Sequence, residues 1–430
     1  GPVLIPQELW DVCSDDPGLP AAERFSPKRR RLYTSEMLLR LGMDYTIRPG
    51  GPGDAAMGGR SLAHSLRFLN EEAAYRVDNL TQHEREIPSF LGYCFSDDCK
   101  ATGDWEEGIP FQREKEIALE EIHKHRYGVE PPATTDMRAY AAASEEKKKS
   151  TNMKEIRKRR FEAVELMNSL FPTTHRIWKD RSRIMKPDLV ATTANAWLGT
   201  TPDGFYLPKA YEQMNVLHTK YYTDGGMLPF MDQFCIDLWR AGQTHKKFWY
   251  MLLQSNSKVI RREQILSLSR NVDGLGYFAG LSWGTSDGRN AEINAGNKML
   301  EMYGDFFLRG KRRNDVALLY SYTTEAFNIG GFGADLKAGQ STRNYEAYFA
   351  CMRARRPANI VVESEIAAGG LKDYKVLIMT NVIIPFPEKV TAEIEKFAAA
   401  GGLVLMDEEC TISLKGAKKT DLSFRRWTDI

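Results

Sequence analysis

Residues 88–99 read PSFLGYCFSDDC, and the interpretation of the whole chain starts from this stretch. The apolar run at 90–95 has the length of a buried strand, and a proline precedes it as a boundary. The run stops at Asp97 and Asp98, and carboxylates at the end of a buried strand are costly unless they are paired or face a cleft. In a (β/α)8 barrel that end of every strand faces the active site. The alternative is that the aspartates cap a following helix, where Asp is common.

The composition is that of an ordinary globular protein. The chain has 430 residues, of which 42% are hydrophobic and 27% charged, and this length suggests two or three domains. The net charge of +2 predicts no nucleic-acid partner and no attraction to an anionic membrane. No apolar run is long enough for a transmembrane helix. Gly1-Pro2 resembles the remnant of a protease cleavage, so the sequence leaves the compartment unknown.

Strand and helix patterns alternate over residues 1–310, which predicts βα units and a parallel sheet. Strand candidates begin at Val3, Asp44, Phe90, Asp188, Val216, Phe248 and Gly274. Helix-like stretches at 231–241 and 263–270 separate the later strands, and a stretch at 290–308 follows the last one. We therefore expect a (β/α)8 TIM barrel with one strand unaccounted for. Because an unclosed barrel leaves unpaired strand edges, the chain is expected to be a fragment, unless the missing strand lies within residues 53–88.

Polar and aromatic residues follow the ends of the later strand candidates. Aromatic rings at these positions suit a site that stacks on the apolar C–H faces of sugars. The residues concerned are Asn195, Trp197, Tyr222, Asp224, Gln254 and Trp283. Asp232 and Asp237 lie in the next helix-like stretch, and we interpret them as first-turn carboxylates favoured by the helix dipole.

A second series of strands and helices begins at Asn314. Strand candidates occur at 315–321, 359–364, 376–381 and 403–407, with helices at 342–355 and 388–400. This alternation predicts a flavodoxin-like, doubly wound α/β domain over residues 314–430, which we expect to be incomplete.

Taken in order, these segments resemble the family-42 glycoside hydrolases, the β-galactosidase family with an attached trimerisation domain. Residues 90–98 resemble the family's fourth strand, which ends in Asn-Glu with the Glu as acid/base. Residues 248–255 resemble the seventh, which carries the nucleophile as Met-Glu-Gln. Residues 186–195, 221–224 and 277–283 resemble the fifth, sixth and eighth strands, and residues 315–407 resemble the trimerisation domain, whose fold is that of class I glutamine amidotransferases.

The resemblance implies roles for individual residues. Asp98 stands where the family has its acid Glu, and Asp97 stands where it has Asn. Leu253 stands where the nucleophilic Glu is expected, so the usual retaining pair is not intact. The nearest replacement is Asp224, at the end of the neighbouring strand. The substrate-binding residues would be Tyr222, Trp197, Trp283, Asn195 and Gln254.

The resemblance also implies partners. A working amidotransferase needs a Cys nucleophile with a His partner, but the matching turn is Thr380-Asn381 and residues 314–430 contain no histidine. We therefore expect a structural or oligomerising domain in which Cys351 and Cys410 are packing residues. The implied partners are an oligo- or polysaccharide substrate and further copies of the chain in a homo-oligomer, as in the trimers of the family. No cofactor and no metal are expected.

Three functions stay open on the sequence. The first is a glycoside hydrolase with Asp98, or Asp97, as general acid and Asp224 as base or nucleophile. The second is a carbohydrate-binding pseudoenzyme that has lost the strand-7 nucleophile, and the third is a barrel hydrolase or lyase that uses the Asp pair with a metal. Retaining glycosidases need two carboxyl groups about 5 Å apart and inverting ones about 6.5–9.5 Å. Two carboxyl groups at either separation would favour hydrolysis, and a lone one would favour binding.

Overall fold

The computed structural model of the chain describes two sets of strands and helices. The described residues are 46–49, 85, 90–97, 179–180, 182–195, 217–221, 230–242, 248–252, 257–277, 289–310, 315–327 and 340–420. Within these ranges, six strands form one sheet and five form another. We call the first sheet with helices α12–α14 the first unit, and the second sheet with α15–α18 the second unit.

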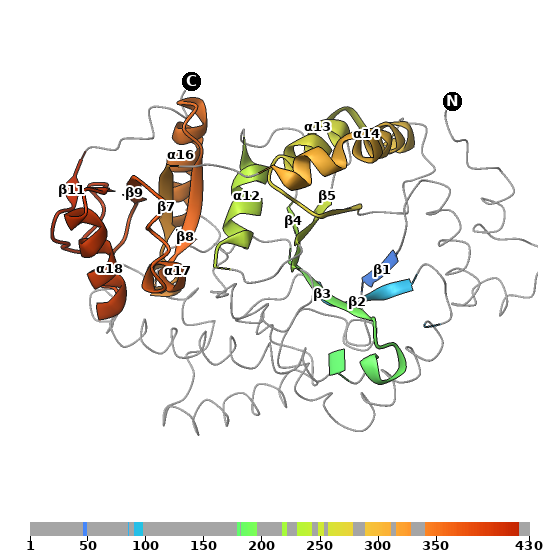
Figure 1. The fold of residues 1–430 in the computed structure, drawn as a ribbon, viewed down its shortest axis with the longest axis horizontal. Helices are drawn as coiled ribbons and strands as arrows, with labels where there is room; N and C mark the ends of the chain where they lie inside the picture. Colours follow the sequence, from blue (N-terminus) through green and yellow to red (C-terminus); the bar gives the residue numbers. More distant parts are fainter. Residues whose placement is uncertain are drawn as a thin grey trace, which may run out of the picture.

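The first sheet has its strands side by side in chain order, and every pair is parallel. The strands are β1 (Thr46–Pro49), β2 (Phe90–Asp97), β3 (Val190–Asn195), β4 (Leu217–Tyr221), β5 (Phe248–Leu252) and β6 (Gly274–Tyr277). Figure 1 shows β1 to β5 curving around an arc. Six of the predicted strands are thus confirmed as neighbours in one sheet. The candidate at Val3 and residues 53–84 lie outside the described residues.

Among the described residues, this unit contains α12 (Met231–Arg240), α13 (Ser257–Leu268) and α14 (Arg289–Arg309). Helix α13 begins at Ser257, ahead of the predicted start at 263. Helices α13 and α14 approach closely at Gly296, where a Cβ atom would lie 1.7 Å from Oε1 of Gln264. The side chain of Gln264 is fully buried, so a larger residue at 296 would require this side chain to move.

The second sheet is also parallel and has the order β11-β10-β9-β7-β8. Its strands are β7 (Val316–Tyr320), β8 (Ala358–Val362), β9 (Val376–Met379), β10 (Leu403–Met406) and β11 (Lys418–Lys419). Its helices are α15 (Tyr322–Phe327), α16 (Gln340–Arg353), α17 (Glu363–Ala367) and α18 (Glu388–Ala399). Placing β7 between β8 and β9 gives the flavodoxin-like order.

The predicted strand at 359–364 ends earlier than expected, at Val362. The carboxylate of Glu365 accepts a hydrogen bond of 3.0 Å from the backbone N–H of Val362. A glutamate that reaches back to the residue before a helix stabilises the helix start. The chain therefore turns into the short helix α17 at Glu363, which the apolar run did not predict.

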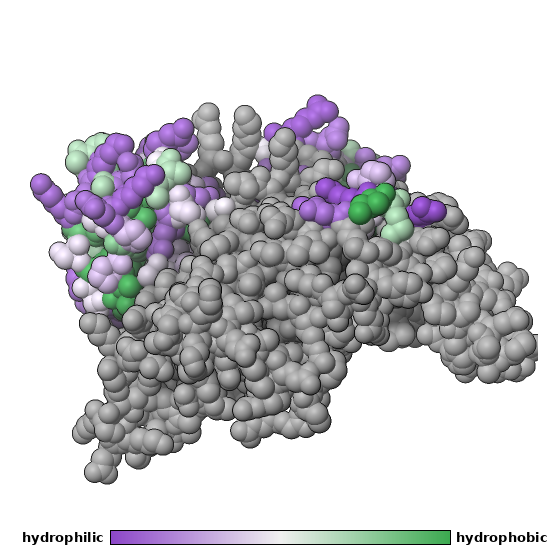
Figure 2. All heavy atoms as spheres, turned by 90° about the horizontal axis from the view of Figure 1, so that it is seen from below, coloured by the Kyte–Doolittle hydropathy of each residue, from purple (hydrophilic) through white to green (hydrophobic). Residues whose placement is uncertain are grey.

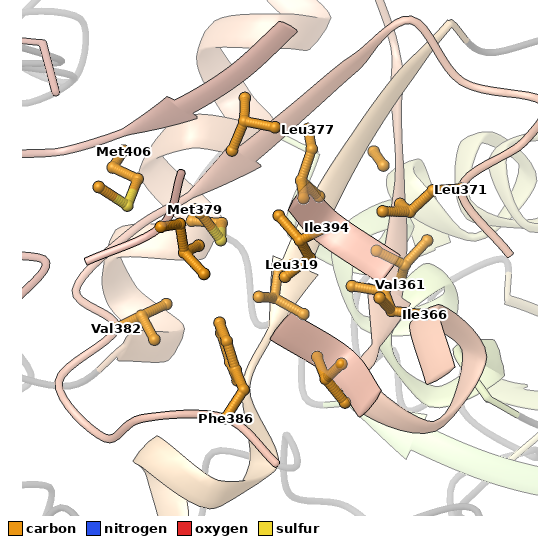
Figure 3. Close-up of a cluster of buried hydrophobic side chains, with 14 of the residues drawn as sticks. Leu319, Val361, Ile366, Leu371, Leu377, Met379, Val382, Phe386, Ile394 and Met406 are labelled. Atoms are coloured by element: carbon orange, nitrogen blue, oxygen red, sulfur yellow. The ribbon is translucent and has the colours of Figure 1, made fainter. Parts of the chain in front are cut away.

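The core of the second unit lies between its sheet and helices α17 and α18 (Figure 3). Leu319, Leu377 and Met379 from the strands and Ile394 from α18 are each fully buried. Fully burying an aliphatic side chain of this size contributes about 1.5–3 kcal/mol. Because β7 and β9 are covered in this way, their sequences are continuous apolar runs, as is usual for parallel sheets.

Helix α12 lies between the two sheets (Figure 1), and its residues 233–239 are buried. Residues 233–239 are each 0–4% exposed. One side of α12 contacts β4, and the other contacts α16 and β8 of the second unit. Phe234 packs against Tyr345 and Tyr348 of α16, with ring centroids 5.6 and 5.4 Å apart. Because residues 233–239 are buried and α12 contacts elements of both units, the two units share this helix.

On the face shown in Figure 2, hydrophilic and hydrophobic side chains of the described residues are interspersed. Helix α14 exposes Met302, Tyr303 and Phe306 by 67%, 55% and 78%. Among the described residues, the longest helices do not combine the length and the apolar character that a membrane crossing requires.

The core of the second unit gives a direct stability test. Leu377→Ala should lower the free energy of unfolding by about 2–5 kcal/mol, because it removes fully buried methyl groups and leaves a cavity. Leu403→Ala is the matched control, since Leu403 starts the neighbouring strand and is 37% exposed. Urea unfolding followed by circular dichroism measures both. Equal losses in the two variants would contradict this packing.

Candidate functional site

The carboxyl ends of five strands of the first sheet meet along one edge. Asp97 pairs with Ala194, and Asn195 pairs with Thr219. At the other end, Tyr221 pairs with Leu252, which in turn pairs with Tyr277. Since all the strands are parallel, chain segments that leave β2, β3, β4, β5 and β6 start from this edge, and active sites of such sheets lie at that edge.

A β-bulge interrupts β2 just before this edge. Cys94 pairs with Thr192 and Asp97 with Ala194, so three steps along β2 match two steps along β3. The extra residue shifts the last part of β2 by one position and changes the direction in which its end leaves the sheet. Bulges of this kind are over-represented next to active sites, and this one directly precedes the Asp97-Asp98 pair.

Two of the predicted site residues lie in described strands. Asp97 is the last residue of β2 and Asn195 the last residue of β3. The remaining ones lie outside the described residues, namely Asp98, Asp224, Tyr222, Trp197, Trp283 and Gln254. The connection along the chain is nevertheless short for several of them: Asp98 follows β2 directly and Tyr222 follows β4 directly.

Sequence reasoning misread a carboxylate of α12. Asp237 lies in the second half of α12, not in its first turn, and is 4% exposed. One of its oxygens, Oδ2, lies 3.2 Å from Nη1 of Arg270 and accepts a hydrogen bond of 2.6 Å from the hydroxyl of Tyr348. The guanidinium of Arg270 also lies over the Tyr348 ring, 5.8 Å from its centroid. These three side chains form a buried polar triad that joins both units.

The turn before β6 is tied to the same helix. The guanidinium of Arg240, the last residue of α12, donates hydrogen bonds to the backbone carbonyls of Arg270 and Asn271. Asn271 has a φ of 57°, a left-handed conformation that Asn tolerates better than most residues. Its side-chain amide donates a hydrogen bond of 2.8 Å to the carbonyl of Gly310. Arg240 and Gly310 thus hold the start of β6 from two sides.

The corresponding edge of the second sheet carries a buried carboxyl group. Glu363 accepts hydrogen bonds from the hydroxyls of Ser321 and Thr323, at 2.5 and 2.7 Å. Burial raises the pKa of Glu363, and the hydrogen bonds from Ser321 and Thr323 oppose that rise. Burial also raises the pKa of Tyr320 well above its usual value, together with the charges of Glu325 and Glu363. The polar groups at this edge of the second sheet are therefore shielded from water.

The turn at Thr380-Asn381, which follows β9, is held in place by hydrogen bonds to buried side chains. Asn381 has a φ of 47°, and its N–H donates to the Asp407 carboxylate at 2.9 Å. The thiol of Cys410 lies next to this turn and accepts a hydrogen bond of 3.3 Å from the N–H of Val382. Burial, with the charge of Asp407, raises its pKa to about 12, and burial raises that of Cys351 to about 11. Because the thiolate is the nucleophile, both thiols are unreactive packing residues, as predicted.

The described part of the chain contains no group of three or more His, Cys, Asp or Glu side chains that could hold a metal ion. The buried groups that sequence reasoning missed are Asp237, Arg270 and Glu363. The burial of Asp237 could have been predicted from the sequence, because this residue interrupts the otherwise apolar stretch FCIDLW. A lone charge in such a stretch needs a buried partner.

Comparisons with known proteins give the fold. No family profile and no curated sequence matches the chain. Its structure is similar to the β-galactosidase of the psychrophilic Marinomonas ef1, with a TM-score of 0.62 at 12% identity, covering 92% of this chain and 76% of that one. It is also similar to Gan42B, a GH42 β-galactosidase from G. stearothermophilus, with a TM-score of 0.61 at 15% identity, covering 96% and 67%.

A third similar structure is an exo-carrageenase of GH42 from Bacteroides ovatus, with a TM-score of 0.57 at 12% identity, covering 88% of this chain and 59% of that one. The chain spans 59% to 76% of the length of these three proteins. The fold is therefore that of the GH42 β-galactosidases, in a divergent form, as the sequence resemblance predicted.

The carboxyl group of Glu363 makes stability depend on pH. Its pKa is raised in the folded state, so folding is favoured while it is protonated, and that contribution is lost as pH rises from the ordinary glutamate range through the raised pKa. Glu363→Gln should therefore flatten the fall in unfolding free energy over this pH range. Glu408→Gln, at an exposed glutamate, is the control. Urea unfolding at a series of pH values measures both, and an unchanged slope in Glu363→Gln would refute the assignment.

Proposed function

We propose that this protein is a glycoside hydrolase with its active site at the carboxyl edge of the first sheet. The observation that carries the proposal is the alignment of five strand ends at that edge, with the β2 bulge directly before Asp97 and Asp98. The likeness to GH42 β-galactosidases supports it. On this proposal the sheet is part of a (β/α)8-type barrel over residues 1–310 with one strand unaccounted for, and residues 314–430 form a separate amidotransferase-like domain.

The proposed chemistry uses two carboxyl groups. Asp98 donates a proton to the glycosidic oxygen as general acid, and Asp224 acts as nucleophile or as the base that activates water. A general acid must hold its proton near the working pH, and a low-dielectric cleft together with the adjacent charge of Asp97 would raise the pKa of Asp98 in the required direction. The substrate is an oligo- or polysaccharide, stacked on Tyr222, Trp197 and Trp283. Asn195 and Gln254 would hydrogen-bond its hydroxyl groups.

One observation favours a second candidate, a carbohydrate-binding pseudoenzyme. Strand β5 ends at Leu252, and the next residue is Leu253, at the position where the family carries its nucleophilic glutamate. A leucine can neither attack the sugar nor activate water. Catalysis then depends on Asp224 at the neighbouring strand, and without it the edge would bind a sugar but leave it intact.

The general acid is tested by Asp98→Asn. The amide keeps the shape of the carboxyl group but supplies no proton at neutral pH, so hydrolysis should fall by about 10²–10⁴-fold while the fold is retained. Asp97→Asn should keep activity and shift the alkaline limb of the pH–rate profile, where Asp98 loses its proton, to lower pH, because it removes a neighbouring negative charge. Initial rates on aryl glycosides and polysaccharides, with circular dichroism as the folding control, provide the measurement.

Two outcomes would change this assignment. If Asp97→Asn is inactive and Asp98→Asn is active, the roles of the two aspartates are exchanged. If both variants keep full activity, the pair caps a helix and the proposed acid is wrong.

We also propose that the chain forms a homo-oligomer, with a trimer as the expected form. The exposed Met302, Tyr303 and Phe306 of α14 support an apolar association surface. Multi-angle light scattering should give a mass that is a multiple of the chain mass, and Phe306→Glu should shift it to a smaller species. Ile184→Glu, at a residue 79% exposed elsewhere, is the control. A monomeric wild type would rule the assembly out.

A further inference from the structure

Tyr348 of the second unit makes a specific contact with the first unit. Its side chain is fully buried, and its hydroxyl donates the 2.6 Å hydrogen bond to Oδ2 of Asp237. Its ring packs edge-on against Phe234 and lies under the guanidinium of Arg270. Arg270 in turn lies 3.2 Å from the same Asp237 oxygen and donates a hydrogen bond of 3.4 Å to the sulfur of Met352 on α16. The second unit therefore contacts both partners of a buried ion pair of the first.

Both partners belong to elements that are directly connected to the proposed active-site edge. Asp237 lies on α12, which is joined to the carboxyl end of β4 by residues 222–229, and these carry Tyr222 and Asp224. Arg270 lies just before β6, whose carboxyl end leads to Trp283. At the start of α12, Phe230 has a φ of 63°, and its ring centroid lies 6.0 Å from that of Phe349 on α16. Contacts from α16 thus reach both ends of α12.

We propose that Tyr348 is a positioning residue of the active site, acting through Asp237 and α12 on the chain that leaves β4. The proposal rests on the proposed glycosidase function and deepens it, because it makes the second unit a working part of the site. A hydrogen bond to a buried carboxylate is short, directional and strengthened by the low local dielectric. This hydrogen bond restricts both the rotation of α12 about its axis and its position along that axis, which apolar packing alone does not do.

The physical reason for an effect at a distance is the rigidity of the connecting elements. Residues 233–239 of α12 are buried. Because a closely packed helix moves as a rigid body, a shift at Asp237 also displaces the first turn of α12. Catalytic groups tolerate little displacement, and a misplacement of about 1 Å can cost about 10²-fold in rate. A change at Tyr348 should therefore affect the rate of the chemical step more than the binding of substrate.

The test is Tyr348→Phe, which keeps the ring and removes the hydroxyl. Tyr374→Phe is the matched control, since its hydroxyl accepts a hydrogen bond of 3.1 Å from Asn359 within the second unit. For Tyr348→Phe we expect kcat to fall about tenfold or more with KM changed less than about twofold, and amide hydrogen exchange over 217–221 and 231–240 to accelerate. Exchange over 376–379, in the core of the second unit, should be unchanged. Tyr374→Phe should leave kcat and the exchange of α12 as in the wild type.

The two readouts separate this inference from the proposed function. If exchange in α12 and β4 is the same in Tyr348→Phe and in the wild type, the inference is overturned, whatever the activity. If exchange accelerates but kcat is unchanged in an active enzyme, Tyr348 is a structural contact only, and the inference is again overturned. If the wild type hydrolyses no glycoside, the proposed function fails on its own, and exchange at 217–221 and 231–240 decides whether Tyr348 controls this edge.

Discussion

The burial of α12 from both sides is the constraint on which the rest of the structure depends. A helix covered by β4 on one side and by α16 and β8 on the other cannot leave a charge unpaired, yet it contains Asp237 in its middle. The carboxylate is accommodated because Arg270 and Tyr348 both contact it. Breaking such a pair by removing one partner typically costs about 3–5 kcal/mol, whereas an apolar replacement of the whole set is often neutral. The triad therefore specifies how the two units fit together more than how stable they are.

The position of α12 matters for the proposed site because this helix follows β4 along the chain, and the proposed site lies at the carboxyl end of β4. The parallel order of β1 to β6 brings the carboxyl ends of five strands to one edge, and a bulge in β2 lies directly before Asp97. The second sheet presents a different kind of edge. There Glu363, Thr380 and Asp407 are buried and hydrogen-bonded to neighbouring protein groups, and burial raises the pKa of the nearby Cys410 thiol. Burial and hydrogen bonding thus disfavour reactive chemistry at the second sheet.

The fold was largely predictable from local patterns, and the interface between the units was not. Continuous apolar runs predicted β7 and β9 because both faces of a parallel sheet are covered, and the order of segments predicted the GH42-like fold. The triad was missed because Asp237, Arg270 and Tyr348 are far apart in the sequence, and only tertiary packing brings them together. The strand at β8 was predicted too long because Glu365 bonds back to Val362, a side-chain contact that hydrophobicity does not report. For the site, residue types and strand ends could be predicted, but carboxyl separations depend on three-dimensional distances that spacing in the sequence does not determine.

The proposed function requires two carboxyl groups to act together at the edge of the first sheet. The most direct measurement is the separation of the Asp98 and Asp224 carboxyl groups in a crystal structure with a sugar bound. We expect both carboxyl groups to face the sugar, at a separation of about 5–5.5 Å for a retaining enzyme or about 6.5–9.5 Å for an inverting one. A separation well beyond that range, or a sugar bound away from both groups, would contradict it.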